Sequence, residues 1–326
     1  MASPSSSLAT RRPDLASFFE FDLEMDSAGF IATEVFPVVD VQSSAGNFGK
    51  MPLEQLLQER DTARAPGGGY SRGKWKFDPV TYVTRENGAE EPIDDNDSEA
   101  YRDYFDVELI STARAYSAVL RNAEKRVADA VFNTTTWAGA SLTTAITNEW
   151  DDFVNAVPIT DVEAAVQKVY DNSGLWANAL IINKKVFRNL RNCETIIERI
   201  NSAGAGNPSK ASDVTKEMLK AVFDLEHIIV AGASRNSAKE GQPATPTQIW
   251  SGEYAMVCRV STSVNMADPC IGRTFHWSKD GSRIGGTVET YRDETVRGDV
   301  VRVRHQVGEQ VLYAEAGHLL SNITTT

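Results

Sequence analysis

Apolar residues recur at every third or fourth position over one long stretch of the chain, from residue 96 to about residue 135. The series is Tyr101, Phe105, Leu109, Ala113, Tyr116, Leu120, Ala123, Val127 and Ala130. Asn96 and Glu99 form a helix-start signature, and no Gly or Pro interrupts residues 96–137. The pattern predicts one rod of about 35 residues, roughly 50 Å long, with its aromatic residues in packing contacts.

The second half of the chain alternates helix and strand patterns. A capping box at Thr160 and Glu163 opens a helix that Gly174 closes. A strand (WANALIIN), a short helix (KKVFRNLRN), an amphipathic helix (SDVTKEMLKAVFDL) and a further strand (HIIVAGA) follow. The end is rich in strand-like pieces, namely YAMVCRVS, IGRTFHWS, GGTVETYRDETV, DVVRVRHQV and VLYAEAGHLLSNI. The alternation of helix and strand predicts an α/β subdomain, followed by a β-rich end of the chain.

Residues 42–98 have too few large apolar side chains to form a core of their own. Within this region Trp75 and Phe77 alternate with Lys74 and Lys76, which is typical of a strand. The sequence APGGG at 65–69 is a turn signal. We therefore expect a long protruding hairpin that gains burial only against another surface.

Charge is segregated in and beside this hairpin. The whole chain of 326 residues has 33 basic and 45 acidic residues, a net charge of −12, which argues against a protein that grips nucleic acid phosphates. Residues 60–85, however, have six basic and two acidic side chains, and residues 86–108 have one basic and ten acidic ones. These segments are either complementary between neighbouring copies or solvated faces of one subunit.

The first alternative makes eleven residues candidates for contact between subunits. They are Arg60, Arg64, Arg72, Lys74, Trp75, Lys76, Phe77, Glu90, Glu91, Asp94 and Asp95.

Motifs for catalysis, cofactors and metals are absent from the sequence. It has no G-x-S-x-G, H-E-x-x-H, G-x-x-x-x-G-K-[ST] or complete G-x-G-x-x-G. The four histidines lie far apart and are predicted to be structural, and the three cysteines match no metal or disulfide spacing, which predicts free thiols. No apolar run is long enough for a membrane span, and the N-terminus has no signal-peptide core, which predicts cytoplasmic folding. We predict no enzyme activity, no catalytic residue, no cofactor and no metal.

The order of several segments is similar to that of a known family. GFIATEVFPVVDV precedes a polar loop with RAPGGG and KWKFDPVTYV, and EEPIDDND leads into the long helix. ALIINKKVFRNLRNCETIIERI, HIIVAGASRNSAKEGQPATPTQIWSG and VRVRHQVGEQVLYAEAGHLLSNI follow in the second half. In this order the chain resembles the major capsid proteins of tailed double-stranded DNA bacteriophages with the Hong Kong 97 fold.

The resemblance implies an α+β fold and a division of the chain into five parts. Residues 1–32 would be an N-terminal arm, 33–95 an extended hairpin called the E-loop, and 96–165 the spine helix with the first part of the P-domain. Residues 166–282 would be an α/β A-domain, and 283–326 strands that return to the P-domain.

The resemblance also implies a function. The chain would assemble in the host cytoplasm into hexamers and pentamers of an icosahedral virion shell, which encloses double-stranded DNA without specific binding. Its expected partners are a separate scaffolding protein, a portal protein at one vertex and a possible decoration protein, with no membrane. The resemblance favours contact between subunits for the hairpin. Two alternatives remain open: an encapsulin-like cellular compartment, and an α/β enzyme with an unrecognised site.

Overall fold

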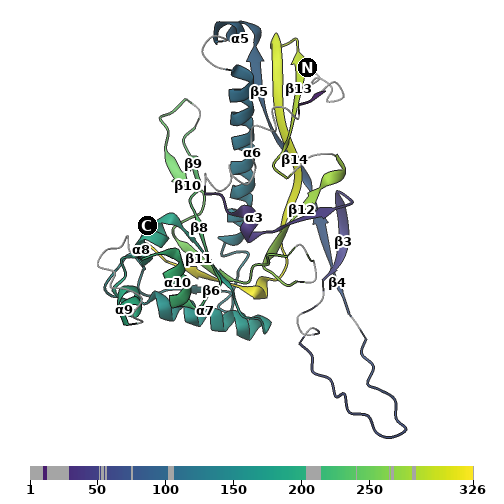
Figure 1. The fold of residues 1–326 in the computed structure, drawn as a ribbon, viewed down its shortest axis with the longest axis vertical. Helices are drawn as coiled ribbons and strands as arrows, with labels where there is room; N and C mark the ends of the chain where they lie inside the picture. The colour runs from purple at the N-terminus through teal and green to yellow at the C-terminus, as the bar shows by residue number, and fades with distance from the viewer. Residues whose placement is uncertain are drawn as a thin grey trace.

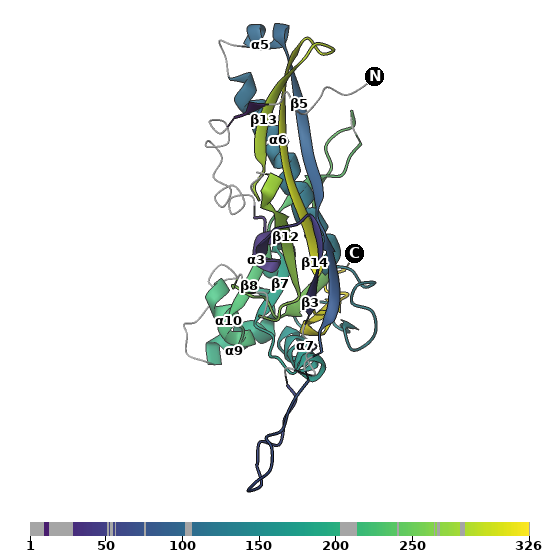
Figure 2. The ribbon, with the colours of Figure 1, turned by 90° about the vertical axis from the view of Figure 1, so that its right-hand side faces the viewer.

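The computed structural model describes residues 10–12, 29–50, 52, 55, 57–74, 76–101, 106–202, 214–239, 241–263, 265, 268–280 and 284–325. The molecule is elongated and contains two main sheets, with one long helix beside the larger sheet (Figure 1, Figure 2). Of the predicted N-terminal arm, residues 1–9 and 13–28 lie outside the described residues.

The larger sheet has six strands. Its order is β1 (Thr10–Arg11), β13 (Thr287–Asp293), β14 (Gly298–Val311), β12 (Gly272–Trp277) and β2 (Val38–Val41), and β5 (Arg85–Asp94) also pairs with β14. Val301 and Val303 of β14 are buried, and the alternate residues Arg302 and Arg304 are partly exposed. The period of two in DVVRVRHQV therefore places valines under the long helix and arginines on the opposite face.

The long helix is α6 (Val107–Val131), which packs on this sheet through Ala115, Tyr116, Val119 and Leu120. The single helix predicted from residue 96 to 135 is wrong. A short helix, α5 (Asp95–Tyr101), comes first, and Asp106 then adopts an extended backbone and accepts a hydrogen bond from the Leu109 amide. This N-cap starts a new helix inside an unbroken apolar pattern, so α6 is shorter than predicted, with 25 residues and a length of about 37 Å.

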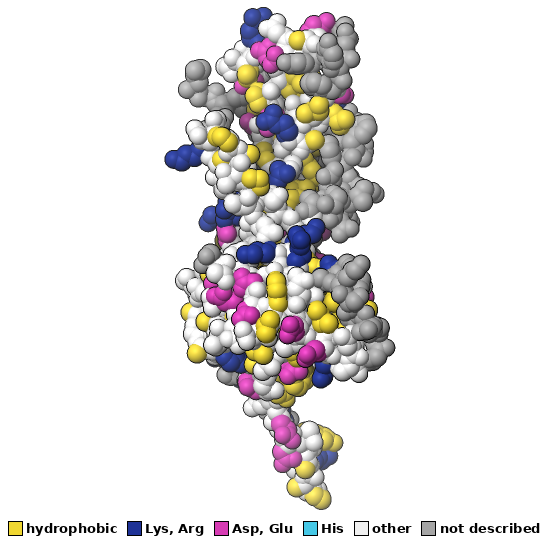
Figure 3. All heavy atoms as spheres, turned by 90° about the vertical axis from the view of Figure 1, so that its left-hand side faces the viewer, with side chains coloured by type: hydrophobic (Ala, Val, Ile, Leu, Met, Phe, Trp, Pro, Cys, Tyr) yellow, Lys and Arg dark blue, Asp and Glu magenta, His cyan; other side chains and the backbone are white. Residues whose placement is uncertain are grey.

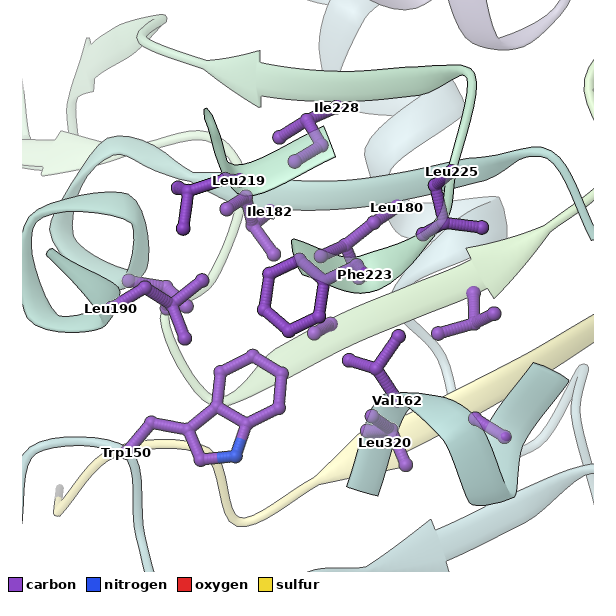
Figure 4. Close-up of a cluster of buried hydrophobic side chains, with 14 of the residues drawn as sticks. Trp150, Val162, Leu180, Ile182, Leu190, Leu219, Phe223, Leu225, Ile228 and Leu320 are labelled. Carbon is purple, nitrogen blue, oxygen red and sulfur yellow. The ribbon is translucent and has the colours of Figure 1, made fainter. Parts of the chain in front are cut away.

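The smaller sheet has five strands, in the order β6 (Thr143–Ala145), β15 (Gly317–Ser321), β11 (Tyr254–Cys258), β7 (Ala179–Asn183) and β8 (His227–Ala231). Four helices belong to this part of the molecule: α7 (Pro158–Ser173), α8 (Lys184–Leu190), α9 (Glu194–Ser202) and α10 (Lys216–Phe223). Their side chains form a core with Trp150 and Leu180 (Figure 4). Gly174 ends α7 at φ +66° as predicted, but α7 starts at Pro158 without a side-chain cap, so the Thr160 capping box does not form.

The remaining elements in the described part of the chain are short. They are α3 (Ala32–Val35), the paired strands β3 (Ala45–Lys50) and β4 (Asp78–Val83), the paired strands β9 (Ser234–Asn236) and β10 (Pro246–Gln248), and the 3₁₀ turns η3 (Ser278–Asp280) and η4 (Ala314–Ala316). A second apolar cluster joins the two sheets, because Val127 of α6 and Phe275 of β12 share it with Ile229 and Met256 of the smaller sheet.

Several strands, among them β5, β12 and β15, pair outside the units that the sequence boundaries suggest. β5 falls in the range 33–95 expected for the hairpin, yet it pairs with β14 in the six-stranded sheet. β12 falls before residue 282 but joins the same sheet, whereas β15 falls after residue 283 but pairs with β11 and β6 in the five-stranded sheet. The chain therefore crosses between the sheets more often than the boundaries allow.

Candidate assembly interface

A long loop, residues 57–77, continues the β3–β4 hairpin away from the body (Figure 1, Figure 3). Its tip is the turn predicted at 65–69: the Gly68 amide donates to the Ala65 carbonyl at 2.9 Å, and Gly67 has φ +80°. Lys74, Lys76 and Phe77 lie outside any strand, because the ladder stops at Lys50 and Asp78. The predicted strand at 74–78 therefore does not form, and Trp75 lies outside the described residues.

The basic candidates all lie on this loop. The Arg64 guanidinium donates to the Gly68 carbonyl at 2.6 Å and lies 4.9 Å from the centroid of the Tyr70 ring, so it helps to shape the tip. Arg72, Lys74 and Lys76 are exposed, and no carboxylate in the described part of the chain pairs with them. These three cations are available to another surface.

The loop also exposes aromatic side chains. Tyr70 is 70% exposed and Phe77 is 55% exposed, side by side in sequence with the cations. Tyr, Phe and Arg are enriched in protein interaction surfaces, whereas Lys is depleted there. The exposed Tyr70, Phe77 and Arg72 are therefore the residues of the loop whose types fit such a surface best.

The root of the hairpin is held firmly. The ring of Tyr82 stacks on the ring of Phe275 of β12, with 4.8 Å between the ring centroids. The centroid of the Phe48 ring lies 5.5 Å from that of Phe275. The Lys50 ammonium donates to the Leu312 carbonyl at 2.6 Å. These contacts set the direction of the loop before any neighbour is present.

The acidic candidates are placed on or just after β5, and three of the four face arginines of the same subunit. The guanidinium of Arg292 donates one hydrogen bond to each carboxylate oxygen of Asp95, at 2.6 and 2.5 Å. This bidentate ion pair lowers the pKa of the Asp95 carboxyl. Glu91 lies 3.7 Å from Arg114 of α6, and Glu90 lies 3.7 Å from Arg302 of β14. This segment is therefore less free to attract a partner than its sequence charge suggests.

Asp94 differs from these three residues. Its carboxylate accepts a hydrogen bond from the Asn96 amide, and no cation among the described residues pairs with it. Among the four predicted acidic residues, Asp94 is thus the one with a charge left for another molecule.

The basic loop and the acidic segment lie at opposite ends of the long axis (Figure 1, Figure 2). The two groups do not meet within one subunit. A contact between them requires a second copy.

The outer face of the six-stranded sheet carries a charge ladder that the sequence analysis missed. Glu289 of β13 lies between Arg302 and Arg304, which donate to it at 2.5 and 2.9 Å. Burial raises the pKa of Glu289, but the two arginines outweigh that effect and hold the pKa below its usual value. A sequence signal for this ladder was available. Arginines alternate with valines in β14, and the neighbouring strand β13 contains one glutamate.

The sequence analysis also missed a buried carboxylate on α6. Glu124 is 0% exposed and accepts hydrogen bonds from the amides of Ile31 and Ala32 and from the indole of Trp250. Glu124, Lys125 and Arg126 stand together between Ala123 and Val127, so the sequence offered no signal that singles out Glu124.

Three of the four histidines have the structural role predicted for them. Nδ1 of His318 bonds to the Ser141 carbonyl and Nε2 to the Thr144 hydroxyl, both at 2.9 Å. Nδ1 of His305 bonds to the Ile284 carbonyl at 2.9 Å. His276 is buried and pairs with Asp40 at 2.7 Å.

Burial lowers the pKa of His318 to about 4 and also lowers the pKa of His305. Both pKa values are below the unfolded value of about 6.5. The stability that these neutral rings contribute is therefore complete above pH 6.5 and is lost as the pH falls toward 4. We expect the melting temperature to fall between pH 7 and pH 4.5, and His318→Asn, which keeps a donor for Ser141, to reduce that fall by a few degrees. Equal falls in wild type and variant would contradict the role of His318.

The three cysteines are free, as predicted, and all three are buried. Burial raises the pKa of Cys193 to about 12 and also raises those of Cys258 and Cys270, so the thiols stay protonated and unreactive at neutral pH. Among the described residues, no three His, Cys, Asp or Glu side chains gather as a metal site, and no helix is long and apolar enough to cross a bilayer.

Comparison with solved structures shows the same architecture in phage proteins. A phage-related protein of Bordetella bronchiseptica RB50 aligns over 97% of this chain and 98% of its own, with a TM-score of 0.69 and 21% identity. A chain of the capsid of cyanophage P-SCSP1u aligns over 88% and 86%, with a TM-score of 0.58 and 13% identity. The chain has the Hong Kong 97 capsid fold.

A virus-like particle from Pyrococcus furiosus shares this fold, with a TM-score of 0.54 and 13% identity over 92% of this chain and 96% of its own. No family model matches the sequence, and no curated protein matches it. In the division that the family resemblance implies, α6 would be the spine helix and the β3–β4 hairpin with its loop would be the E-loop.

Proposed function

We propose that the chain is the major capsid protein of a tailed double-stranded DNA bacteriophage and forms the icosahedral shell of the virion. The observation that carries this proposal is the E-loop, which presents Tyr70, Phe77 and three unpaired cations to solvent. A segment without its own core is retained in a fold when a neighbour buries it. In the Hong Kong 97 fold that neighbour is another copy of the same chain.

The E-loop of one copy would contact the acidic end of β5 on the next. The separation of the two charged groups along the molecule supports a contact between copies, and Asp94 supports it more than its paired neighbours do. Repeated head-to-tail contacts of this kind close into rings. Hexamers and pentamers are the rings that an icosahedral shell requires.

The five-stranded unit would be the A-domain and the six-stranded unit with α6 the P-domain, with β12 and β15 assigned by their pairing. We also propose a separate scaffolding protein during assembly in the host cytoplasm, a portal protein at one vertex and a possible decoration protein. A net charge of −12 supports a shell that encloses DNA without holding its phosphates. The chain would have no catalytic role.

The test is expression of the full chain, alone and with the proteins of its own assembly genes, followed by sedimentation and negative-stain electron microscopy. We expect closed shells of uniform diameter. Monomers or dimers under all conditions would contradict the proposal. Particles from the natural source that hold enzyme cargo and lack DNA would instead establish a cellular compartment.

A further inference from the structure

Glu124 is the charged group of the spine helix that is most completely removed from water. It is 0% exposed, and no basic side chain pairs with it in the described ranges. Burial raises the pKa of Glu124, and the hydrogen bonds that it accepts act in the opposite direction. A buried charge without a cation is costly, so its retention calls for a structural reason.

The carboxylate binds three donors from two other parts of the chain. Oε1 accepts from the Ile31 amide at 2.9 Å and from the Trp250 indole at 2.5 Å, and Oε2 accepts from the Ala32 amide at 2.8 Å. Ile31 and Ala32 begin the segment that leads through α3 and β2 into the E-loop. Trp250 follows β10 and lies just before the central strand of the five-stranded sheet.

A second contact holds the same segment. The Gly232 amide donates to the Gly29 carbonyl at 2.9 Å, and Gly29 has φ +70°. A Cβ at Gly29 would lie 2.8 Å from the Cα of Gly232, so the two backbones touch. The entry to the E-loop is thus pinned between the spine helix and the end of β8.

The chemistry of this joint requires glutamate. Three donors need two acceptor oxygens, and a glutamine would offer one oxygen and turn its NH₂ group toward an N–H group. An apolar residue would leave all three donors buried and unpaired. Aspartate is one methylene shorter and would not reach the same positions.

We infer that Glu124 is a positioning residue for assembly. It holds Ile31 and Ala32, at the start of the segment that leads into the E-loop, against the spine helix. Through Trp250 it also couples the position of this segment to the five-stranded unit. The inference rests on the proposed shell function. Its consequence is that loosening the joint changes the geometry of contacts between subunits more than it changes the fold of one subunit.

The experiment compares Glu124→Gln and Trp250→Phe with two controls. Asp129→Asn removes an exposed carboxylate from the same helix, and Val119→Ala removes buried methyl groups from a different apolar cluster than the one that contains Ile31, Ala32 and Trp250. Amide hydrogen exchange is measured on the unassembled subunit, and shell yield and diameter are measured by microscopy. Circular dichroism and melting temperature report the fold of each variant.

We expect exchange at Ile31 and Ala32 to rise about tenfold or more in Glu124→Gln and less in Trp250→Phe, while exchange in β7 is unchanged. Shells of both variants should be fewer and irregular in diameter, and Asp129→Asn should match wild type. If Glu124→Gln does not fold, Trp250→Phe carries the test.

Two results would overturn the inference. One is unchanged exchange and normal shells in the joint variants. The other is equally irregular shells from Val119→Ala at the same loss of melting temperature, which would make the role of Glu124 merely structural. If wild type itself forms no shells, the proposed function fails, and the exchange data still decide whether Glu124 holds the segment.

Discussion

Replacing Leu120 by proline should abolish folding of the subunit. Leu120 is 3% exposed in the interior of α6 and packs with Val119 and Val301 under the six-stranded sheet. An interior proline removes one backbone hydrogen bond and clashes with the preceding turn, at a cost of about 3 kcal/mol or more. Lost packing of the leucine adds to this, and typical domains are stable by only about 5–15 kcal/mol.

The matched control is Val107→Pro. Val107 is the first residue of α6, where its amide has no partner within the helix, and Asp106 before it has the extended backbone that proline favours. Soluble yield and circular dichroism should be close to wild type for Val107→Pro and lost for Leu120→Pro. A soluble Leu120→Pro variant that forms shells would refute the position of this residue inside a continuous helix.

Reversing the charges of Arg72, Lys74 and Lys76 to glutamate should prevent shell formation and leave the subunit folded. The three side chains are exposed and pair with no carboxylate of the described part of their own subunit, so their loss should change the melting temperature little. At a repeated interface, the reversed charges would repel their acidic partners in every copy. We expect shell yield to fall at least tenfold, measured by sedimentation and microscopy.

The control for this prediction keeps the charge, with Arg72→Lys, Lys74→Arg and Lys76→Arg, and should assemble normally. Wild-type assembly should also weaken as salt is raised, because ions screen such contacts over about 10 Å at 0.1 M. Asp94→Lys in the reversed variant should restore some yield, since Asp94 has no cation partner among the described residues. Normal yield of the reversed variant at low and high salt would show that the basic loop faces solvent.

The candidate interface was predictable in part. The sequence predicted that the cations and Phe77 lie on a protruding segment, because that segment has too few apolar residues to form a core and this follows from local composition alone. The acidic partners were overestimated, because the partner of Asp95 is Arg292, 197 positions away. Net charge over a segment does not reveal which charges a distant strand neutralises.

The sequence by itself determined the class of the protein, most of the helix and strand order in its second half, and the presence of a hairpin without a core; it missed β5, β9, β10 and the break between α5 and α6. These properties follow from periodicity and composition within short windows, and side-chain burial on each strand and helix enforces them locally. Val301 and Val303, for example, alternate with arginines in the sequence and are buried against α6 in the structure.

Only the tertiary structure decided where the long helix begins, which sheet β12 and β15 join, and what Glu124 binds. The apolar series continues past Asp106, but the backbone of this residue is extended and its side chain caps a new helix. Glu124 and Trp250 are 126 positions apart and become partners only when the spine helix packs on the smaller sheet. Contacts of this kind depend on the packing of whole units, which no local pattern encodes.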